Sequence, residues 1–348
     1  MGTVIEEPKH AARGIRFARR GKECRQTGSS LGLPGVSGGW HSDGVSQAKL
    51  EQLRAVIRSF GSCLTAYSGG VDSVFLAVVA HQELGEKALA AIADSPSLPR
   101  SELDEALELG RRFAFPVRVV NTREFDNASY LANPQNRCYF CKHALFEELG
   151  PLAAREGYAV LAYGENASDI GDHRPGAQAA KEFQVRAPLK EVGMTKAEIR
   201  ECSARLGLPT ADKPQLACLS SRIPYGEAVT VEKLRMIEAA EAVLRGEGFF
   251  EVRVRHHELK AGALARLEIG VAELARIMES GRHARIAEKL REIGYAHVTL
   301  DLQGYRRGSV NEPIPSGRRL GATSASAMSV GAVENRTGGD GWVPVRIA

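Results

Sequence analysis

At 348 residues, with 43% hydrophobic and 25% charged side chains, the chain has the composition of a soluble globular protein that can hold two domains. No apolar run approaches the ~20 residues that a membrane-spanning helix needs, and the Arg-rich residues 1–25 lack the apolar segment of a secretory signal. Residues 1–50 hold eight of the 46 Lys and Arg and four of the 42 Asp and Glu, which leaves 38 of each sign in residues 51–348. We therefore expect a cytoplasmic protein with no membrane partner, and the neutral main part disfavours nucleic acid as a partner.

Residues 1–45 are basic and end in a Gly- and Ser-rich stretch, which predicts a disordered leader. From residue 46 to residue 224, short apolar runs alternate with longer helical patterns. This alternation predicts an α/β domain with a parallel, doubly wound sheet that is covered by helices on both faces. The predicted strands are 64–67, 88–93, 117–120 and 159–163, and the predicted helices start near residues 47, 71, 101 and 141.

The pattern changes near residue 225, and residues 225–311 are predicted to form a smaller α+β domain. The predicted elements are a helix over 231–245, strands over 251–257 and 266–269, a helix over 271–293 and a strand over 297–302. Residues 312–348 are rich in Gly, Ser and Pro, and we expect a flexible tail there.

The sequence Ser-Gly-Gly-Val-Asp-Ser at residues 68–73 joins the first predicted strand to the helix that starts at Val71. Gly69 and Gly70 can take positive φ and let backbone N–H groups converge on an anion, and the helix N-terminus adds a partial positive charge. Asp72 is placed to work with a magnesium ion that bridges phosphates. The segment lacks the lysine of the common nucleotide-binding loop. The candidate phosphate-binding residues are Ser68, Gly69, Gly70, Val71, Asp72 and Ser73, and the alternative is a polar turn.

Two further polar segments follow predicted strands, where ligands of parallel sheets bind. Asp94 follows the second strand and can reach a ribose or adenine, or else it belongs to the start of the next helix. A Gly-rich segment, residues 164–176, follows the fourth strand. Within it Asp169 and Asp172 can help to bind magnesium and Arg174 can meet a phosphate, the alternative being a solvated loop.

Cys138 and Cys141 form a C-x-x-C motif before a helix, and Cys218 lies in a Pro-flanked loop. The pair alone is compatible with a metal, a redox disulfide or coincidence. Three thiolates without an obvious fourth ligand suit an iron–sulfur cluster with one open iron, since structural zinc fills all four positions. The sequence therefore predicts a cluster site at these three residues.

The strand over residues 251–257 has a period of two, which places Arg253 and Arg255 on one face. Two such arginines can form a fork for phosphate or carboxylate. Glu268 on the next strand is a candidate partner, and surface arginines paired with glutamate are the alternative.

Together these motifs resemble the ATP-dependent sacrificial sulfur transferases of LarE type, in the PP-loop ATP pyrophosphatase superfamily. The resemblance runs over residues 47–311 and includes SGGVDS, ADSPSLPR, NRCYFCK, GENASDIGDHRPG, ACLSSRIPYG, VRVRHH and LDLQGYRRGS. It implies that ATP and Mg²⁺ are used to adenylate the carboxylates of a pyridinium dicarboxylate mononucleotide, with release of pyrophosphate. Sulfur then displaces AMP and gives the thiocarboxylates of the nickel-pincer nucleotide cofactor, which serves lactate racemase and related enzymes.

The resemblance also implies roles for individual residues. Cys218 matches a cysteine that gives up its own sulfur in some members, and Cys138 and Cys141 match two more that help to hold a 4Fe-4S cluster in others; we favour the cluster. The substrate-binding residues it implies are Ser221, Arg222, Arg253, Arg255 and Glu268. A sulfide or cysteine-derived sulfur donor and a nickel-inserting protein are the implied partners, and we expect a homo-oligomer. The alternatives are a PP-loop tRNA thiolase and a non-catalytic ATP-binding sensor.

Overall fold

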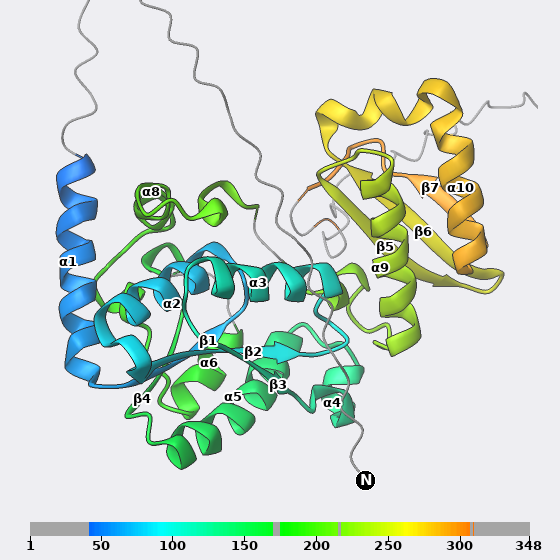
Figure 1. The fold of residues 1–348 in the computed structure, drawn as a ribbon. Helices are drawn as coiled ribbons and strands as arrows, with labels where there is room; N and C mark the ends of the chain where they lie inside the picture. The colour runs from blue at the N-terminus through cyan, green and yellow to red at the C-terminus, as the bar shows by residue number, and fades with distance from the viewer. Residues whose placement is uncertain (1–41, 170–174, 215–216, 307–308, 310–348) are drawn as a thin grey trace, which may run out of the picture. The chain divides into compact units, whose positions relative to one another are not determined.

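The computed structural model describes residues 42–169, 175–214, 217–306 and 309 of the chain (Figure 1). Most of the predicted leader and the whole predicted tail lie outside these residues, as do Asp172 and Arg174. The first described helix, α1 (Ser42–Phe60), begins a little before the predicted start near residue 47. Within the described residues, no helix is both long enough and apolar enough to cross a membrane.

The first sheet contains four parallel strands in the order β3-β2-β1-β4. β1 is Cys63–Tyr67, β2 is Ala88–Asp94, β3 is Val117–Asn121 and β4 is Val160–Tyr163. The predicted strands are confirmed to within one residue at each end. β1 is buried along its whole length, which is why its apolar run shows no alternation.

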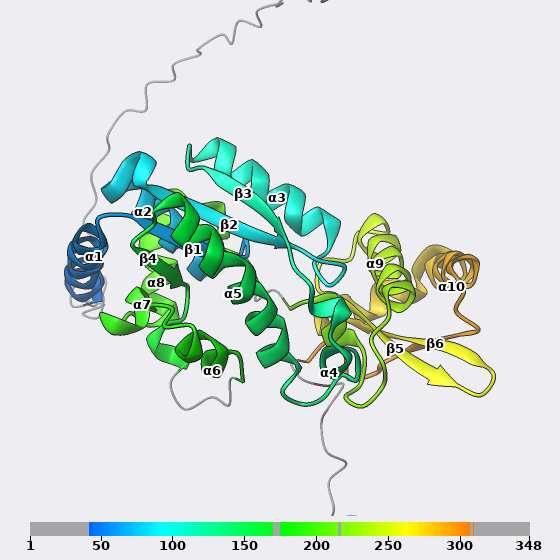
Figure 2. The ribbon, with the colours of Figure 1, turned by 90° about the horizontal axis from the view of Figure 1, so that it is seen from below.

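Helices cover both faces of this sheet. On one face α1, α2 (Val71–Leu84), α3 (Arg100–Arg112) and α8 (Lys196–Arg205) share a core, to which Leu53, Phe75 and Ile199 contribute. On the other face α5 (Arg137–Glu156) and α6 (Pro175–Glu182) pack against Leu64 and Ala66 through a second core. Figure 2 shows α5 and α6 on the side of the sheet that faces the viewer. The predicted α/β fold with a doubly wound parallel sheet is confirmed.

Short elements join these layers. The helices are α4 (Ala128–Leu131) and α7 (Pro188–Glu191). The 3-10 helices in this part of the chain are η1 (Gly85–Lys87), η2 (Glu124–Asp126), η3 (Ala167–Asp169), η4 (Pro209–Asp212) and η5 (Leu219–Arg222).

The second sheet has the order β5-β6-β7, with β5 antiparallel to β6 and β6 parallel to β7. Its strands are β5 (Val252–Leu259), β6 (Gly262–Ile269) and β7 (His297–Leu300). Helices α9 (Val231–Gly246) and α10 (Arg282–Ile293) bury Leu244 and Leu290 against it. This is the predicted smaller α+β arrangement.

The single helix predicted over 271–293 is wrong. The chain forms a 3-10 segment, η6 (Val271–Gly281), and α10 starts only at Arg282. Ser280 and Gly281 have φ of 52° and 65°, a left-handed conformation that ends a right-handed helix. The apolar spacing on both sides of this break is helical, so periodicity alone gave one continuous helix.

Candidate active site

The candidate phosphate-binding residues 68–73, here called the phosphate loop, join β1 to α2 and include the first turn of α2. Gly69 has a φ of 70°, and a Cβ atom there would lie 3.1 Å from the Cβ atom of Ala106 in α3, so both backbone and space call for glycine. Gly70 is the N-cap of α2 and provides no side-chain cap. The hydroxyl of Ser73 accepts from the Ser68 N–H at 3.1 Å and donates to the Gly70 carbonyl at 3.1 Å. These bonds keep the loop closed at the start of a helix, where N–H groups can bind an anion.

Asp72 lies in the first turn of α2 and forms an ion pair with Lys196 of α8. The Nζ atom of Lys196 is 2.6 Å from Oδ2 of Asp72, and the two side chains are 31% and 20% exposed. The chain after β4 packs against the same turn, since a Cβ atom at Gly164 would lie 3.0 Å from the nitrogen of Ser73 and 3.2 Å from the Cβ atom of Asp72. Glycine at 164 therefore lets the polar segment after β4 approach the phosphate loop.

That polar segment continues into η3. Glu165 is buried, accepts from the Tyr163 hydroxyl, and accepts from Nζ of Lys190 at 3.0 Å. Burial raises the pKa of Glu165, but these hydrogen bonds outweigh it and leave the pKa below its ordinary value. Asp169 is buried, and its Oδ2 accepts from the Asn166 N–H at 3.2 Å. Asp169 thus orders the segment in this structure, and its predicted role in binding magnesium stays a prediction.

Asp94 ends β2 at the same sheet edge as the phosphate loop. Its Oδ1 is 2.6 Å from Nη1 of Arg100, and Arg100 also donates to the Ser95 carbonyl at 2.8 Å. Both side chains are partly exposed, so the carboxylate remains accessible beside its ion pair.

Cys138 and Cys141 lie in the first two turns of α5, and Cys218 is the N-cap of η5. Nη2 of Arg137 is 3.9 Å from the sulfur of Cys218, and Nη1 donates to the Ser220 carbonyl at 2.9 Å. The Leu219 N–H donates to the Ser97 carbonyl at 2.8 Å, which ties η5 to the segment after β2. Despite their separation in sequence, the three cysteines are therefore attached to neighbouring elements.

The thiols are close enough to affect one another. Burial raises the pKa of the Cys141 thiol far above its ordinary value, and the negative charges of Cys218, Glu124 and Cys138 raise it further, while Arg137 opposes them. The pKa of Cys138 is also raised, first by desolvation of its sulfur and then by Cys218, although the residue as a whole is exposed.

The three thiols can be compared with the needs of a single metal ion and of a 4Fe-4S cluster. Among the described residues, no group of three His, Cys, Asp or Glu is arranged to hold a single metal ion. A 4Fe-4S cluster does not need such convergence, because each thiolate binds a different iron. Three soft thiolates beside the buried Arg137 cation, which would offset part of the negative charge of a thiolate-bound cluster, are a donor set that fits this group.

Buried polar side chains surround the cysteines. The hydroxyls of Ser97, Tyr130 and Ser220 form a closed set, with Ser220 Oγ 2.7 Å from Ser97 Oγ and 2.9 Å from the Tyr130 hydroxyl. Glu124 of η2 is buried, and its Oε2 has no hydrogen-bond partner within the described part of the chain. Buried polar groups thus lie close to Cys141 and Cys218, while Cys138 is exposed.

Arg222 connects the loop that contains Cys218 to the second sheet through Glu241. Its Nε and Nη2 lie 2.8 and 3.1 Å from the two carboxylate oxygens of Glu241 in α9, and both residues are buried. Its Nη1 donates to the carbonyls of Ala217 and Cys218 at 2.6 and 2.9 Å. Glu241 also accepts from the Val254 N–H of β5 at 3.2 Å. In this structure the Arg222 guanidinium binds protein groups and positions Cys218; the predicted contact of Arg222 with substrate stays a prediction.

The two predicted anion-binding arginines of β5 differ in their surroundings. Arg255 is buried and donates to Oε2 of Glu268 at 2.7 and 3.0 Å, and to the Ser221 carbonyl at 3.1 Å. Arg253 lies 5.1 Å from the ring centre of Tyr305 and forms no ion pair among the described residues. Burial lowers the pKa of Arg253, and the positive charges of Arg222 and Arg255 lower it further, while Glu241 and Tyr305 oppose them. Of the two arginines, Arg253 is the one without an ion pair among the described residues.

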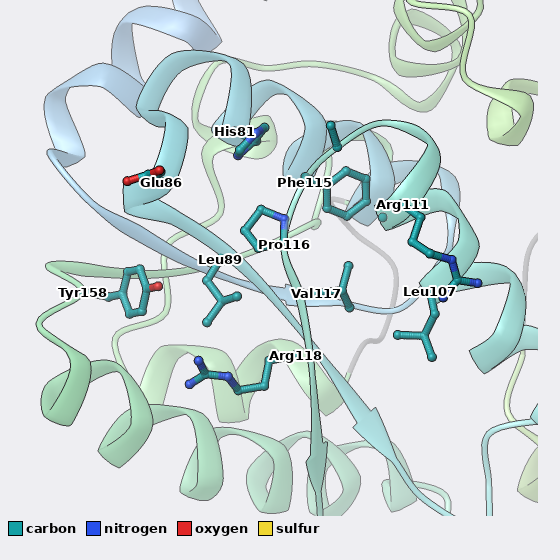
Figure 3. A pocket seen from close by; sticks show the side chains of 12 residues that line it. His81, Glu86, Leu89, Leu107, Arg111, Phe115, Pro116, Val117, Arg118 and Tyr158 are labelled. Carbon is teal, nitrogen blue, oxygen red and sulfur yellow. The ribbon is translucent and has the colours of Figure 1, made fainter. Parts of the chain in front are cut away.

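A surface pocket lies at the other ends of the strands and is separate from these residues (Figure 3). It opens where β2 and β3 begin, beside the C-terminal end of α2. Its lining residues are His81, Glu86, Leu89, Leu107, Gly110, Arg111, Ala114, Phe115, Pro116, Val117, Arg118 and Tyr158. The candidate site follows the carboxyl ends of the strands, where ligands of open parallel sheets bind.

Lys196, Arg137 and Glu241 were not among the residues predicted for the site. Lys196 follows Thr195, whose hydroxyl and the Glu198 carboxylate form a capping box at the start of α8. The T-x-x-E spacing was a readable signal for that helix start. Arg137 and Glu241 carry no such signal, because their roles depend on partners that are distant in sequence.

No family model matches the chain. An uncharacterized protein of Synechocystis sp. is 43% identical over 265 residues, which are 76% of this chain and 97% of the relative. The pyridinium-3,5-bisthiocarboxylic acid mononucleotide synthase of Lactiplantibacillus plantarum is 30% identical over 267 residues, which are 76% of this chain and 95% of the relative. The chain belongs to the LarE family.

A more distant relative is consistent with the PP-loop superfamily. The glutamine-hydrolyzing GMP synthase of Sulfurimonas denitrificans is 25% identical over 194 residues, which are 50% of this chain and 37% of the relative. This likeness fits the PP-loop fold predicted from residues 68–73. Membership in the LarE family, together with this relative, supports an ATP-using enzyme of nickel-pincer cofactor synthesis that uses ATP and Mg²⁺ and takes a small nucleotide as substrate.

Proposed function

We propose that the chain is an ATP-dependent sulfur transferase acting on pyridinium-3,5-dicarboxylate mononucleotide. It adenylates each carboxylate and converts it to a thiocarboxylate. The observation that carries the proposal is the position of Cys218. Its loop is hydrogen-bonded to the segment after β2 through Leu219, and Arg222 and Glu241 connect the same loop to β5, which bears Arg253. The Cys218 loop is thus linked both to the first sheet and to a strand that bears Arg253, a cation with no ion pair among the described residues.

The first half-reaction belongs to the edge of the first sheet. A substrate carboxylate oxygen attacks the α-phosphorus of ATP, the bond to the bridging oxygen breaks, and pyrophosphate leaves. N–H groups of the phosphate loop and of the first turn of α2 would stabilise the departing negative charge. Asp72 would hold magnesium, which supplies charge neutralisation at the phosphates, with Asp169 and Asp172 as further candidate ligands. Arg174 would contact a phosphate. Asp94 would contact the nucleoside.

The second half-reaction belongs to the cysteines. Sulfur attacks the carbonyl carbon of the acyl-adenylate, and AMP leaves with the electron pair of the broken C–O bond. Cys138, Cys141 and Cys218 would hold a 4Fe-4S cluster, whose contribution when bound is a transferable sulfide. Arg137, 3.9 Å from the Cys218 sulfur, would balance the negative charge there. If Cys218 instead gives its own sulfur, elimination across its Cα–Cβ bond would leave dehydroalanine.

The two half-reactions would use different parts of the chain. Residues 46–224 would form the ATP pyrophosphatase domain, and residues 225–311 would bind the anionic substrate during sulfur transfer. Arg253, together with Ser221, is the best-placed group for the phosphate or carboxylates of the substrate. A cytoplasmic setting, a homo-oligomer, a sulfide or cysteine-derived donor and a nickel-inserting partner complete the proposal.

The function is tested with protein purified without oxygen and supplied with ATP and Mg²⁺. We expect pyrophosphate release to require the pyridinium dicarboxylate mononucleotide, and the product mass to show oxygen replaced by sulfur. Transfer RNA serves as the control substrate and is expected to have no effect. Pyrophosphate release that tRNA stimulates, or ATP binding without any turnover of the dicarboxylate, would contradict the proposal.

The two arginines of β5 give a prediction that separates binding from stability. Arg253→Ala should raise the KM for the dicarboxylate about ten- to hundred-fold, because a charge-assisted contact is lost, with the KM for ATP and the free energy of unfolding little changed. Arg255→Ala leaves Glu268 buried with weaker compensation, so the free energy of unfolding should fall by about 3 kcal/mol. Steady-state kinetics and urea unfolding measure the two effects. An equal loss of affinity for ATP in Arg253→Ala would place that residue at the nucleotide instead.

A further inference from the structure

The Arg253 guanidinium lies beside an aromatic ring and has no ion pair in the part of the chain that the structure describes. Its central carbon is 5.1 Å from the ring centre of Tyr305, within the ~6 Å over which the face of an aromatic ring attracts a cation. Its Nη1 donates to the Val252 carbonyl at 2.8 Å. A ring face and a carbonyl stabilise a cation without cancelling its charge, whereas a carboxylate would cancel it.

The arginines that surround Arg253 are already paired. Arg222 binds Glu241 and Arg255 binds Glu268, so both of these carboxylates are occupied. Arg253 is therefore the cation without a carboxylate in this group. Burial and the positive charges of Arg222 and Arg255 lower its pKa, which shows that a charge at this position is costly. The ring of Tyr305 offsets part of that cost and leaves the charge of the half-buried guanidinium available to an anionic ligand.

The segment that carries Tyr305 is fixed to β6 through its backbone. The Asp301 N–H donates to the Leu267 carbonyl and the Tyr305 N–H donates to the Ile269 carbonyl, both at 2.8 Å. Gly304 has a φ of 71°, and a Cβ atom there would lie 2.8 Å from the Ile269 carbonyl oxygen, so this close approach requires glycine. Since β6 pairs with β5 from end to end, the ring has a fixed place relative to the strand that bears its arginine.

We propose that Tyr305 is a positioning residue whose ring holds the Arg253 guanidinium, with its charge uncancelled, ready for an anionic group of the mononucleotide substrate. This inference rests on the proposed function, because it takes Arg253 as a substrate-binding residue. Tyr305 acts through Arg253 and need not touch the substrate itself. An arginine that is already oriented loses less side-chain freedom when the anion binds. The contribution of Tyr305 therefore concerns affinity for the dicarboxylate and not affinity for ATP.

The test replaces the ring and measures substrate affinity in two ways. Tyr305→Leu removes the ring and keeps an apolar side chain. We expect its KM for the dicarboxylate mononucleotide in pyrophosphate release to rise about three- to thirty-fold, the range that a cation–π contact provides, with kcat and the KM for ATP close to wild type. Calorimetric titration of the mononucleotide without ATP should show the same rise in Kd. Tyr305→Phe keeps the ring without the hydroxyl and should restore both constants.

Leu302→Ala is the matched control, because Leu302 belongs to the same segment and its side chain is 85% exposed. It should bind the mononucleotide as wild type does. A double variant tests whether the ring acts through the guanidinium. Tyr305→Leu should then add little to the KM already raised by Arg253→Ala, because two residues that act as one unit are not additive.

Four outcomes would overturn the inference. They are an unchanged KM in Tyr305→Leu while Arg253→Ala raises it, an equal loss in Tyr305→Phe, an equal loss in Leu302→Ala, and additive effects in the double variant. An unchanged KM in both Tyr305→Leu and Arg253→Ala would instead contradict the proposed role of Arg253. Absence of dicarboxylate-dependent pyrophosphate release in the wild type would contradict the proposed function itself.

Discussion

Asp72→Asn is expected to abolish pyrophosphate release while leaving the fold intact. The carboxylate is the group in the phosphate loop that can hold magnesium, and asparagine of the same shape removes its charge. Stability should change by less than about 1 kcal/mol, because the Asp72–Lys196 pair is partly exposed and such pairs contribute little. Rates of pyrophosphate release and the melting temperature measure the two effects.

Glu83→Gln provides the control for this variant. Glu83 lies at the opposite end of α2 and also forms ion pairs, in its case with Arg54 and Arg58 of α1. Loss of its charge should cost some stability and leave pyrophosphate release near the wild-type rate. A wild-type rate in Asp72→Asn would remove residues 68–73 from the reaction. A loss of folded protein in Asp72→Asn would show that the carboxylate has a structural role that its exposure does not indicate.

The fold was predictable where signals are local. The four strands of the first sheet are short apolar runs bounded by polar turns, and the phosphate loop is defined by two glycines and a helix start within six residues. Each of these features depends on neighbours in sequence. The break at Ser280 and Gly281 was not predicted, because it leaves no local signal in the apolar pattern. The left-handed backbone conformation of these two residues interrupts the helix without changing the spacing of the apolar residues.

The site was predictable in its residue types but not in their partners. Alternation placed Arg253 and Arg255 on one face of β5, with Glu268 as a candidate partner. It could not show that Glu268 pairs with Arg255 and that Arg253 has no ion pair among the described residues. In the same way, the motif around Cys218 contains Arg222, but the motif does not show which residue Arg222 binds. Its partner Glu241 is 19 residues away and reaches Arg222 because α9 packs beside the Cys218 loop. Buried ion pairs depend on three-dimensional contacts, and these follow from the packing of whole elements.

The hydrogen bonds of η5 also explain why the loop that contains Cys218 should keep its conformation when the Cys218 thiol is replaced. The backbone of Cys218 is held by Arg222, and the next residue is held by Ser97, so the loop does not depend on the thiol. Substitution of the sulfur should therefore remove chemistry without moving the loop. The cysteine variants consequently report on the reaction itself.

Cys218→Ala should abolish formation of the thiocarboxylate while pyrophosphate release continues, because adenylation uses the other end of the site. If a cluster supplies the sulfur, Cys138→Ala and Cys141→Ala should lose both iron and sulfur transfer in the same way, and Cys202→Ala, a buried thiol of α8, should keep both. If Cys218 gives its own sulfur, only Cys218→Ala should fail, and one turnover should leave the wild-type protein lighter by one hydrogen sulfide. Iron content, sulfide content and intact-protein mass separate these outcomes. Sulfur transfer that persists in Cys218→Ala would contradict both mechanisms, since each requires this sulfur beside Arg137.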